Sequence, residues 1–98
     1  MTEEVTYQAL QGGIALITLN RPHKRNAINV SASSALARLV EQTEANPDIR
    51  VVVLTGAGPL AFCAGADLDD IAAGIGEQIA AHQAGMGGLI HAERRKPW

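Results

Sequence analysis

Two apolar runs of strand length, IALITL at residues 14–19 and VVVLTG at residues 51–56, constrain the fold of this chain more than any other feature. Continuous apolar runs are typical of strands that are buried on both faces, and the second run has the β-branched composition of an interior strand. Residues 4–10 form a further expected strand, joined to residues 14–19 through the turn Gln11-Gly12-Gly13 as a hairpin.

A helical period separates these two runs. Apolar or small residues recur at helical spacing after Ser31, at Leu36, Leu39, Val40 and Thr43. We expect Ser31 or Ser33 to cap this helix and Asn46-Pro47 to end it. The order strand, helix, strand predicts a crossover connection between parallel neighbours, hence an α/β fold.

Two more helices are expected in the second half of the chain. A short one begins at Asp67 and ends near Ile71. A longer one covers about residues 76–93, although interior glycines at 85, 87 and 88 weaken it by about 1 kcal/mol each relative to alanine. Its expected apolar stripe consists of Ile79, His82, Met86, Leu89 and Ile90.

Composition limits the class of protein. The 98 residues suit one small domain or part of a larger one, and 47% hydrophobic against 18% charged residues indicates a globular chain. A net charge of −2 offers no electrostatic footprint for nucleic acid, and no apolar run approaches the roughly 20 residues that span a bilayer. The single cysteine, Cys63, excludes an internal disulfide framework, and we expect a reducing, cytoplasmic location.

The stretch FCAGADL at residues 62–68 is the strongest candidate for chemistry. It places small residues where a buried strand ends and a helix is expected to begin, and the first N–H groups of a helix lack intrahelical partners. Small side chains at Ala64, Gly65 and Ala66 would let a ligand reach such a donor, which could stabilise an oxygen that becomes negative during reaction. Asp67 is expected to cap the helix. Simple packing of small residues at a strand-to-helix turn is the alternative.

Two blocks of sequence resemble the enoyl-CoA hydratase/isomerase, or crotonase, superfamily. These are LNRPHKRNAI at residues 19–28 and VVVLTGAGPLAFCAGADL at residues 51–68, in the family's order and separated by one helix. The closing KPW resembles the start of the family's next strand. The resemblance implies a crotonase-like ββα spiral, of which residues 1–98 would be the N-terminal part, with the first two or so repeats of an acyl-CoA-binding domain and no second domain.

The resemblance also implies roles for particular residues. Ala66 would supply a main-chain N–H to the oxyanion hole that holds the thioester oxygen. Lys24 or Arg25 would approach the coenzyme A phosphates, whereas without the family both residues would simply indicate a solvated turn. The residues implied to line the acyl-CoA path are Lys24, Arg25, Ala27, Ala64, Gly65, Ala66, Asp67 and Leu68.

Some of the family's catalytic groups have no counterpart in the sequence. The second oxyanion donor, a glycine, and the two catalytic acids of the hydratases follow the KP strand, so we expect the chain to be a fragment that is inactive alone. Acids present here are expected at helix N-termini or on the surface, and the histidines and the cysteine are expected to be structural or solvated, with no metal site. These residues are Asp69, Asp70, Glu77, Glu93, His23, His82, His91 and Cys63.

Several functions remain open at this point. The complete protein would be an enoyl-CoA hydratase, a lyase of fatty-acid or related acyl-CoA metabolism, which takes coenzyme A as part of its substrate, needs no other cofactor, and assembles as a homotrimer or hexamer. Isomerases, thioester hydrolases and other crotonase-type enzymes share the same half-site. A truncated, non-catalytic binding or assembly element is the alternative of another class. A nucleotide-binding unit is disfavoured because Gly56, Gly58 and Gly65 do not form the G-x-G-x-x-G spacing.

Overall fold

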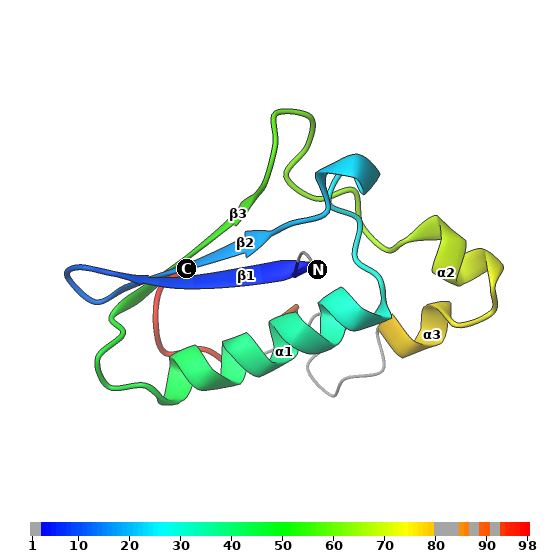
Figure 1. Ribbon diagram of the computed structural model, residues 1–98. Helices are drawn as coiled ribbons and strands as arrows, with labels where there is room; N and C mark the ends of the chain where they lie inside the picture. The colour runs from blue at the N-terminus through cyan, green and yellow to red at the C-terminus, as the bar shows by residue number, and fades with distance from the viewer. Residues whose placement is uncertain (1–2, 80–84, 87–88, 91–92) are drawn as a thin grey trace.

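A three-stranded sheet with one long helix beneath it dominates the computed structural model, which describes residues 3–79, 85–86, 89–90 and 93–98 (Figure 1). The elements follow the chain as β1 Val5–Leu10, β2 Ile14–Leu19, the 3-10 helix η1 Pro22–Lys24, α1 Val30–Ala45, β3 Val51–Gly56, α2 Leu68–Ala72 and α3 Gly76–Ile79.

The sheet has the order β1-β2-β3. β1 pairs with β2 antiparallel, with Val5 opposite Leu19, and β2 pairs with β3 parallel, with Ile17 opposite Leu54. The predicted hairpin and the predicted crossover through α1 are therefore both confirmed. The prediction that residues 51–56 form an interior strand is wrong, because β2 is central and β3 lies at an edge of the sheet in the described part of the chain.

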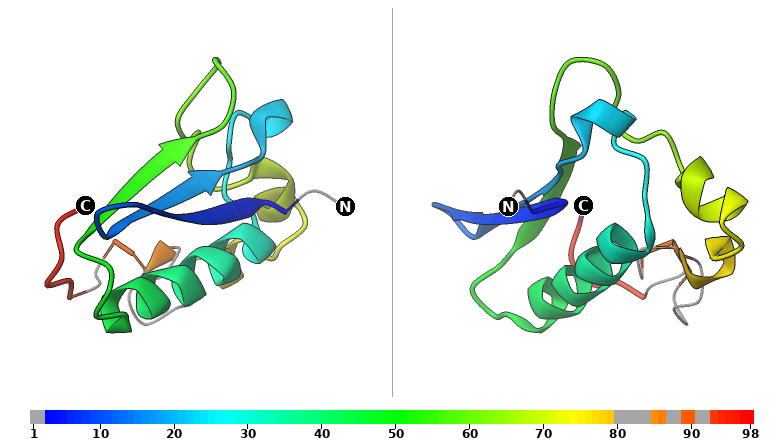
Figure 2. Two further views of the ribbon diagram at one scale, coloured as in Figure 1. Left: turned by 60° about the vertical axis from the view of Figure 1, so that its left-hand side comes forward. Right: turned by 45° about the vertical axis from the view of Figure 1, so that its right-hand side comes forward.

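One face of the sheet is packed against α1, as the two views of Figure 2 show. Along β2, Ala15, Ile17 and Leu19 are buried, whereas the alternate side chains are half-buried. The expectation that residues 14–19 are buried on both faces is therefore wrong. The reason is that successive side chains of a strand point to opposite faces, and α1 covers only one of them.

The long helix α1 begins earlier than predicted. Asn29, not Ser31 or Ser33, is its N-cap, and the Asn29 side chain accepts a hydrogen bond of 2.8 Å from the amide of Ala32. Ser33 lies inside the helix, where its hydroxyl is buried and donates to the carbonyl of Ile79 at 2.7 Å. The predicted end at Asn46-Pro47 is confirmed.

The helix predicted over residues 76–93 is wrong in its described part. α3 is short and contributes the buried side chain of Ile79 to the core, while Gly85 lies in a bend, Met86 in a 3-10 conformation and residues 89–90 in a turn. Gly85 has a φ of +85°, which is incompatible with a right-handed helix. Residues 80–84, 87–88 and 91–92, including His82 and His91, lie outside the described residues. None of the described helices is long and apolar enough to cross a membrane.

Candidate functional site

The two sequence motifs meet because β2 and β3 are parallel. Parallel strands end at the same edge of a sheet, so the segment after β2 and the segment after β3 leave the sheet side by side. They join in an isolated parallel bridge between Ile28 and Ala66. The amide of Ile28 donates to the carbonyl of Gly65 at 2.7 Å, and the amide of Asp67 donates to the carbonyl of Ile28 at 2.8 Å.

Asn26 ties these two segments together. Its side chain is 1% exposed, accepts a hydrogen bond from the amide of Arg21 at 2.9 Å, and donates to the carbonyls of Ala57 at 2.9 Å and Ala61 at 2.8 Å. Its φ of +59° is left-handed, a region that asparagine tolerates better than most residues. Asn26 thereby fixes the turn that carries its neighbours Lys24 and Arg25.

A buried ion pair fixes the second motif. The Arg21 guanidinium lies 2.8 Å from Oδ2 of Asp67, and the same Nη1 donates to the carbonyl of Ala27 at 2.7 Å. The Asp67 Oδ1 atom accepts from the amide of Asp69 at 2.8 Å, which confirms Asp67 as the N-cap of α2. The hydrogen bond from Arg21 holds the pKa of the Asp67 carboxyl below its ordinary value. Nothing in the sequence indicated this pairing across 46 positions.

The amide of Ala66 occupies a different position in the backbone from the one predicted. It precedes the N-cap of α2, so it is not one of the first N–H groups of that helix. In the bridge, the carbonyl of Gly65 and the amide of Asp67 point toward Ile28, and the amide of Ala66 therefore points to the opposite side. No hydrogen bond within the described residues uses this amide.

Gly65 sets the backbone course immediately before this amide. Its φ is +90°, a conformation that side chains with a Cβ rarely adopt, and a Cβ added there would meet no atom within 4 Å. The glycine is therefore required by backbone conformation and not by close packing.

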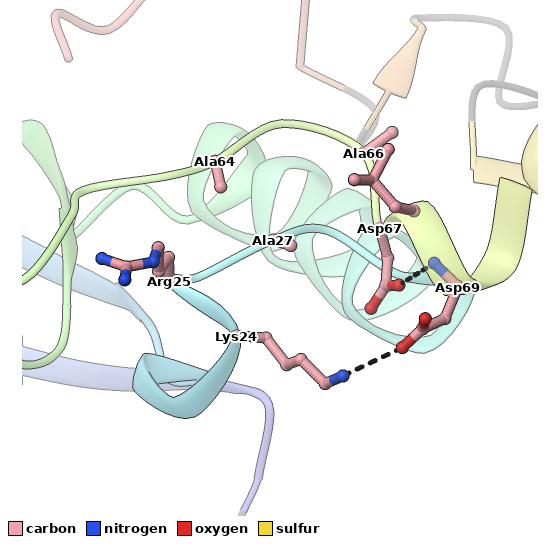
Figure 3. A pocket seen from close by; sticks show the side chains of 8 residues that line it. Lys24, Arg25, Ala27, Ala64, Ala66, Asp67 and Asp69 are labelled. Atoms are coloured by element: carbon pink, nitrogen blue, oxygen red, sulfur yellow. Dashed lines mark hydrogen bonds and ion pairs between the residues drawn. The ribbon is translucent and has the colours of Figure 1, made fainter.

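A cavity of about 320 Å³ opens beside Ala66 (Figure 3). Seven of the eight residues predicted to line an acyl-CoA path line it, and Gly65 is the exception. Asp69, which the sequence indicated only as a helix N-terminal acid, is the additional lining residue. The complete set is Lys24, Arg25, Ala27, Ala64, Ala66, Asp67, Leu68 and Asp69.

Two cationic side chains reach this cavity, one from the last residue of η1, Lys24, and one from the residue that follows it, Arg25. The Lys24 ammonium forms an ion pair of 2.9 Å with Asp69, and this hydrogen bond raises the pKa of Lys24 above its ordinary value. Arg25 has a left-handed φ of +52°, and its side chain extends away from Lys24 in Figure 3. Among the described ion pairs, none includes Arg25.

The other candidates from the sequence lie outside this arrangement. His23 is in η1 and does not line this cavity, and Glu77 and Glu93 are exposed. Cys63 is half-buried against the core, where its sulfur accepts a hydrogen bond from the amide of Gly65 at 3.5 Å. Over the described residues, no group of three metal-ligating side chains comes together.

Comparison with known proteins supports the family resemblance that the two sequence motifs indicated. A family model described as enoyl-CoA hydratase/isomerase matches residues 9–94. A probable enoyl-CoA hydratase of Mycobacterium tuberculosis is 48% identical over 64 residues, which are 65% of this chain and 25% of that protein. A mevalonyl-coenzyme A hydratase of Aspergillus fumigatus is 41% identical over 88 residues, or 86% of this chain and 32% of that one.

Structural similarity extends over nearly all of the chain. The crystal structure of a carnitinyl-CoA hydratase from Mycobacterium avium superposes with a TM-score of 0.88 at 38% identity, covering 99% of this chain and 37% of that one. The predicted fold class, an α/β arrangement equivalent to the N-terminal part of the crotonase fold, is therefore confirmed. The chain spans about a quarter to a third of the length of the curated relatives that it matches.

Proposed function

Because the chain belongs to the enoyl-CoA hydratase/isomerase family, we propose that its cavity binds an acyl-CoA thioester and that the Ala66 amide holds the thioester oxygen. The observation that carries this proposal is the unused amide of Ala66 beside the cavity. An N–H already fixed in place costs no reorganisation when charge develops on an oxygen in front of it. One such donor is worth about 10²- to 10³-fold in kcat in enzymes where it has been removed.

The reaction that we propose is the hydration of a 2-enoyl-CoA. Addition of water places a hydroxyl at C3 and a proton at C2, and the thioester oxygen carries negative charge in between. The three relatives described above are named as hydratases, which supports this choice over an isomerase or a thioester hydrolase. This chain would contribute one of the two oxyanion donors, and the family resemblance puts the second donor and the acids later in the sequence than residue 98.

The charges around the cavity suit the rest of the substrate. Lys24 and Arg25 lie at one side of the cavity and would meet the phosphates of coenzyme A, whose anionic oxygens form strong charge-assisted hydrogen bonds with such groups. The cavity's two carboxylates are already engaged, Asp67 with Arg21 and Asp69 with Lys24. Neither is therefore proposed as the acid that activates water.

The test is the hydration of crotonyl-CoA by the complete gene product, which is monitored as the loss of the absorbance of the conjugated enoyl group. Ala66→Pro removes the amide hydrogen, and we expect kcat to fall about 10²- to 10³-fold with a much smaller change in KM. Leu60→Pro is the control, because the main chain of Leu60 makes no hydrogen bond among the described residues, Leu60 is 64% exposed and it does not line the cavity. Thermal unfolding of both variants checks that each is folded.

The possible outcomes separate the alternatives. Full activity in Ala66→Pro would contradict the proposed donor. Binding of crotonyl-CoA without hydration would favour an isomerase or a hydrolase, and absence of binding would favour the non-catalytic element. The trimeric or hexameric assembly and the cytoplasmic location stay predictions.

A further inference from the structure

Lys24 and Asp69 both line the cavity and form an ion pair with each other. Lys24 Nζ is 2.9 Å from Asp69 Oδ2, and Figure 3 shows the two side chains extended toward each other from η1 and from the first turn of α2. Both side chains keep water contact, with 45% of Lys24 and 76% of Asp69 exposed. Such an exposed pair opens at little cost, since solvent replaces the lost contact.

Asp69 differs from its two acidic neighbours in having no other described partner for its carboxylate. The carboxylate of Asp67 holds Arg21, and Oδ2 of Asp70 accepts a hydrogen bond of 3.0 Å from the amide of Val30. Both of these contacts hold segments of the fold together. The Asp69 carboxylate, in contrast, can release Lys24 without breaking any other described side-chain contact.

We propose that Asp69 is an internal competitor of the coenzyme A phosphates for the Lys24 ammonium, an inference that rests on the proposed function. In the ligand-free protein the carboxylate occupies the ammonium, and a phosphate oxygen must displace it when the acyl-CoA binds. Lysine suits such an exchange, because its ammonium is a compact charge with three rotatable donors on a flexible stem. Asp69 thereby lowers the affinity for the phosphate-bearing part of the substrate and leaves the acyl part unaffected.

The hydrogen bond to Asp69 raises the pKa of Lys24, so the ammonium stays charged over the whole neutral range. The exchange of partners is thus a competition between two anions for one cation and does not depend on a change in the protonation of Lys24.

Asp69→Asn tests the competition, with dissociation constants measured for crotonyl-CoA and for crotonyl-pantetheine, which lacks the nucleotide and its phosphates. We expect Asp69→Asn to bind crotonyl-CoA about two- to fivefold more tightly, the range that corresponds to one exposed ion pair, and to bind crotonyl-pantetheine as the wild type does. Glu77→Gln removes the same charge from an exposed position outside the cavity and should leave both constants unchanged.

A double variant separates release of Lys24 from simple loss of repulsion. In the Lys24→Met background, Asp69→Asn should no longer tighten crotonyl-CoA binding. If the full gain persists there, Asp69 acts by general repulsion and the competition is overturned. If Asp69→Asn has no effect while wild-type protein still hydrates crotonyl-CoA, the competition fails and the proposed function stands. If wild-type protein binds neither thioester, both fail.

Discussion

Asn26 shows how a single side chain can position a site that it does not line. It is buried and holds a left-handed backbone conformation. Its side chain makes three hydrogen bonds, of which one closes the turn after β2 and two join that turn to the loop after β3. We expect Asn26→Ala to lower the free energy of unfolding by about 3 kcal/mol, because it leaves buried polar groups unpaired and because alanine tolerates a positive φ less well than asparagine does. Urea unfolding of the two proteins measures the difference.

Asn26→Gly is the control that divides this loss into its two parts. Glycine loses the same three hydrogen bonds but adopts positive φ without strain, so it should be about 1 kcal/mol more stable than the alanine variant. Equal stabilities for the two variants would show that the backbone conformation contributes nothing. Stabilities equal to that of the wild type would contradict the role assigned to the side chain.

The Arg21–Asp67 pair gives the protein a specific response to acid. Since the hydrogen bond from Arg21 lowers the pKa of Asp67 below its ordinary value of 3.8, folding favours the ionised carboxylate. The stabilisation is therefore complete above that ordinary value and is lost as the pH falls through the lower pKa of the folded state. Urea midpoints measured between about pH 7 and about pH 2 should fall at the acid end for the wild type.

Two asparagine variants check the assignment of this acid response. Asp67→Asn should be less stable at neutral pH and should lack most of the additional acid loss, because no carboxylate remains to be protonated. Asp69→Asn removes an equal charge from a side chain that is 76% exposed, and its acid profile should follow that of the wild type. An unchanged profile in Asp67→Asn would mean that other groups control acid unfolding.

At the scale of elements, periodicity and β-branched composition sufficed to predict β1, β2, α1 and β3, because each is a regular segment with clear turn residues at its ends. The N-cap of α1 was mispredicted, since several capping residues occur near its start. Tertiary contacts decide among them: Asn29 also donates to Glu4, and Ser33 is used inside the helix to bond Ile79. The predicted helix over 76–93 failed at a backbone conformation, the positive φ of Gly85.

The candidate site was predictable only in part for a similar reason. Parallel strands bring the two motifs to one edge, so the lining residues could be named from the motifs and the family resemblance. The Arg21–Asp67 and Lys24–Asp69 pairs join positions more than 40 residues apart, and their sequence neighbourhoods contain several equivalent charges. Selection among those charges depends on the bridge between Ile28 and Ala66, which local patterns do not encode.

The junction between β3 and the loop after it depends on Gly56. A Cβ at this position would lie 2.3 Å from the carbonyl oxygen of Phe62 and 2.7 Å from the side-chain nitrogen Nδ2 of Asn26, so Gly56→Ala must displace the loop. We expect a loss of about 2 kcal/mol in the free energy of unfolding, typical of overpacking at a tight contact. Gly12→Ala is the comparison, since a Cβ there meets nothing within 4 Å and only its φ of +84° is unfavourable, a cost of about 1 kcal/mol. A larger loss for Gly12→Ala would contradict the steric explanation.

On the scale of the whole molecule, the described residues cover the sheet on one face only. Register places Leu10, Ile14, Leu16 and Val53 on the face away from α1, because paired residues point to the same side of a sheet. Leu10 is 39% exposed and Val53 is 43% exposed, and Val53 also lies on the edge strand. The amide of Val52 donates to the carbonyl of Pro97 at 3.0 Å, so the outer edge of β3 is partly occupied. Adjacent exposed apolar side chains on the open face nevertheless favour contact with another chain.

We therefore expect the 98-residue chain to self-associate through this face, with a weight-average mass that rises with concentration in sedimentation velocity. Val53→Lys puts a charge on the open face and should shift the chain toward monomer without a comparable loss of stability, since the Val53 side chain is not part of the core. Ser34→Lys adds the same charge on the exposed side of α1 and should leave association unchanged. If the wild-type chain stays monomeric, or if Val53→Lys associates as strongly as the wild type does, the open face is not a pairing surface and the covering of one face by α1 is sufficient for this chain.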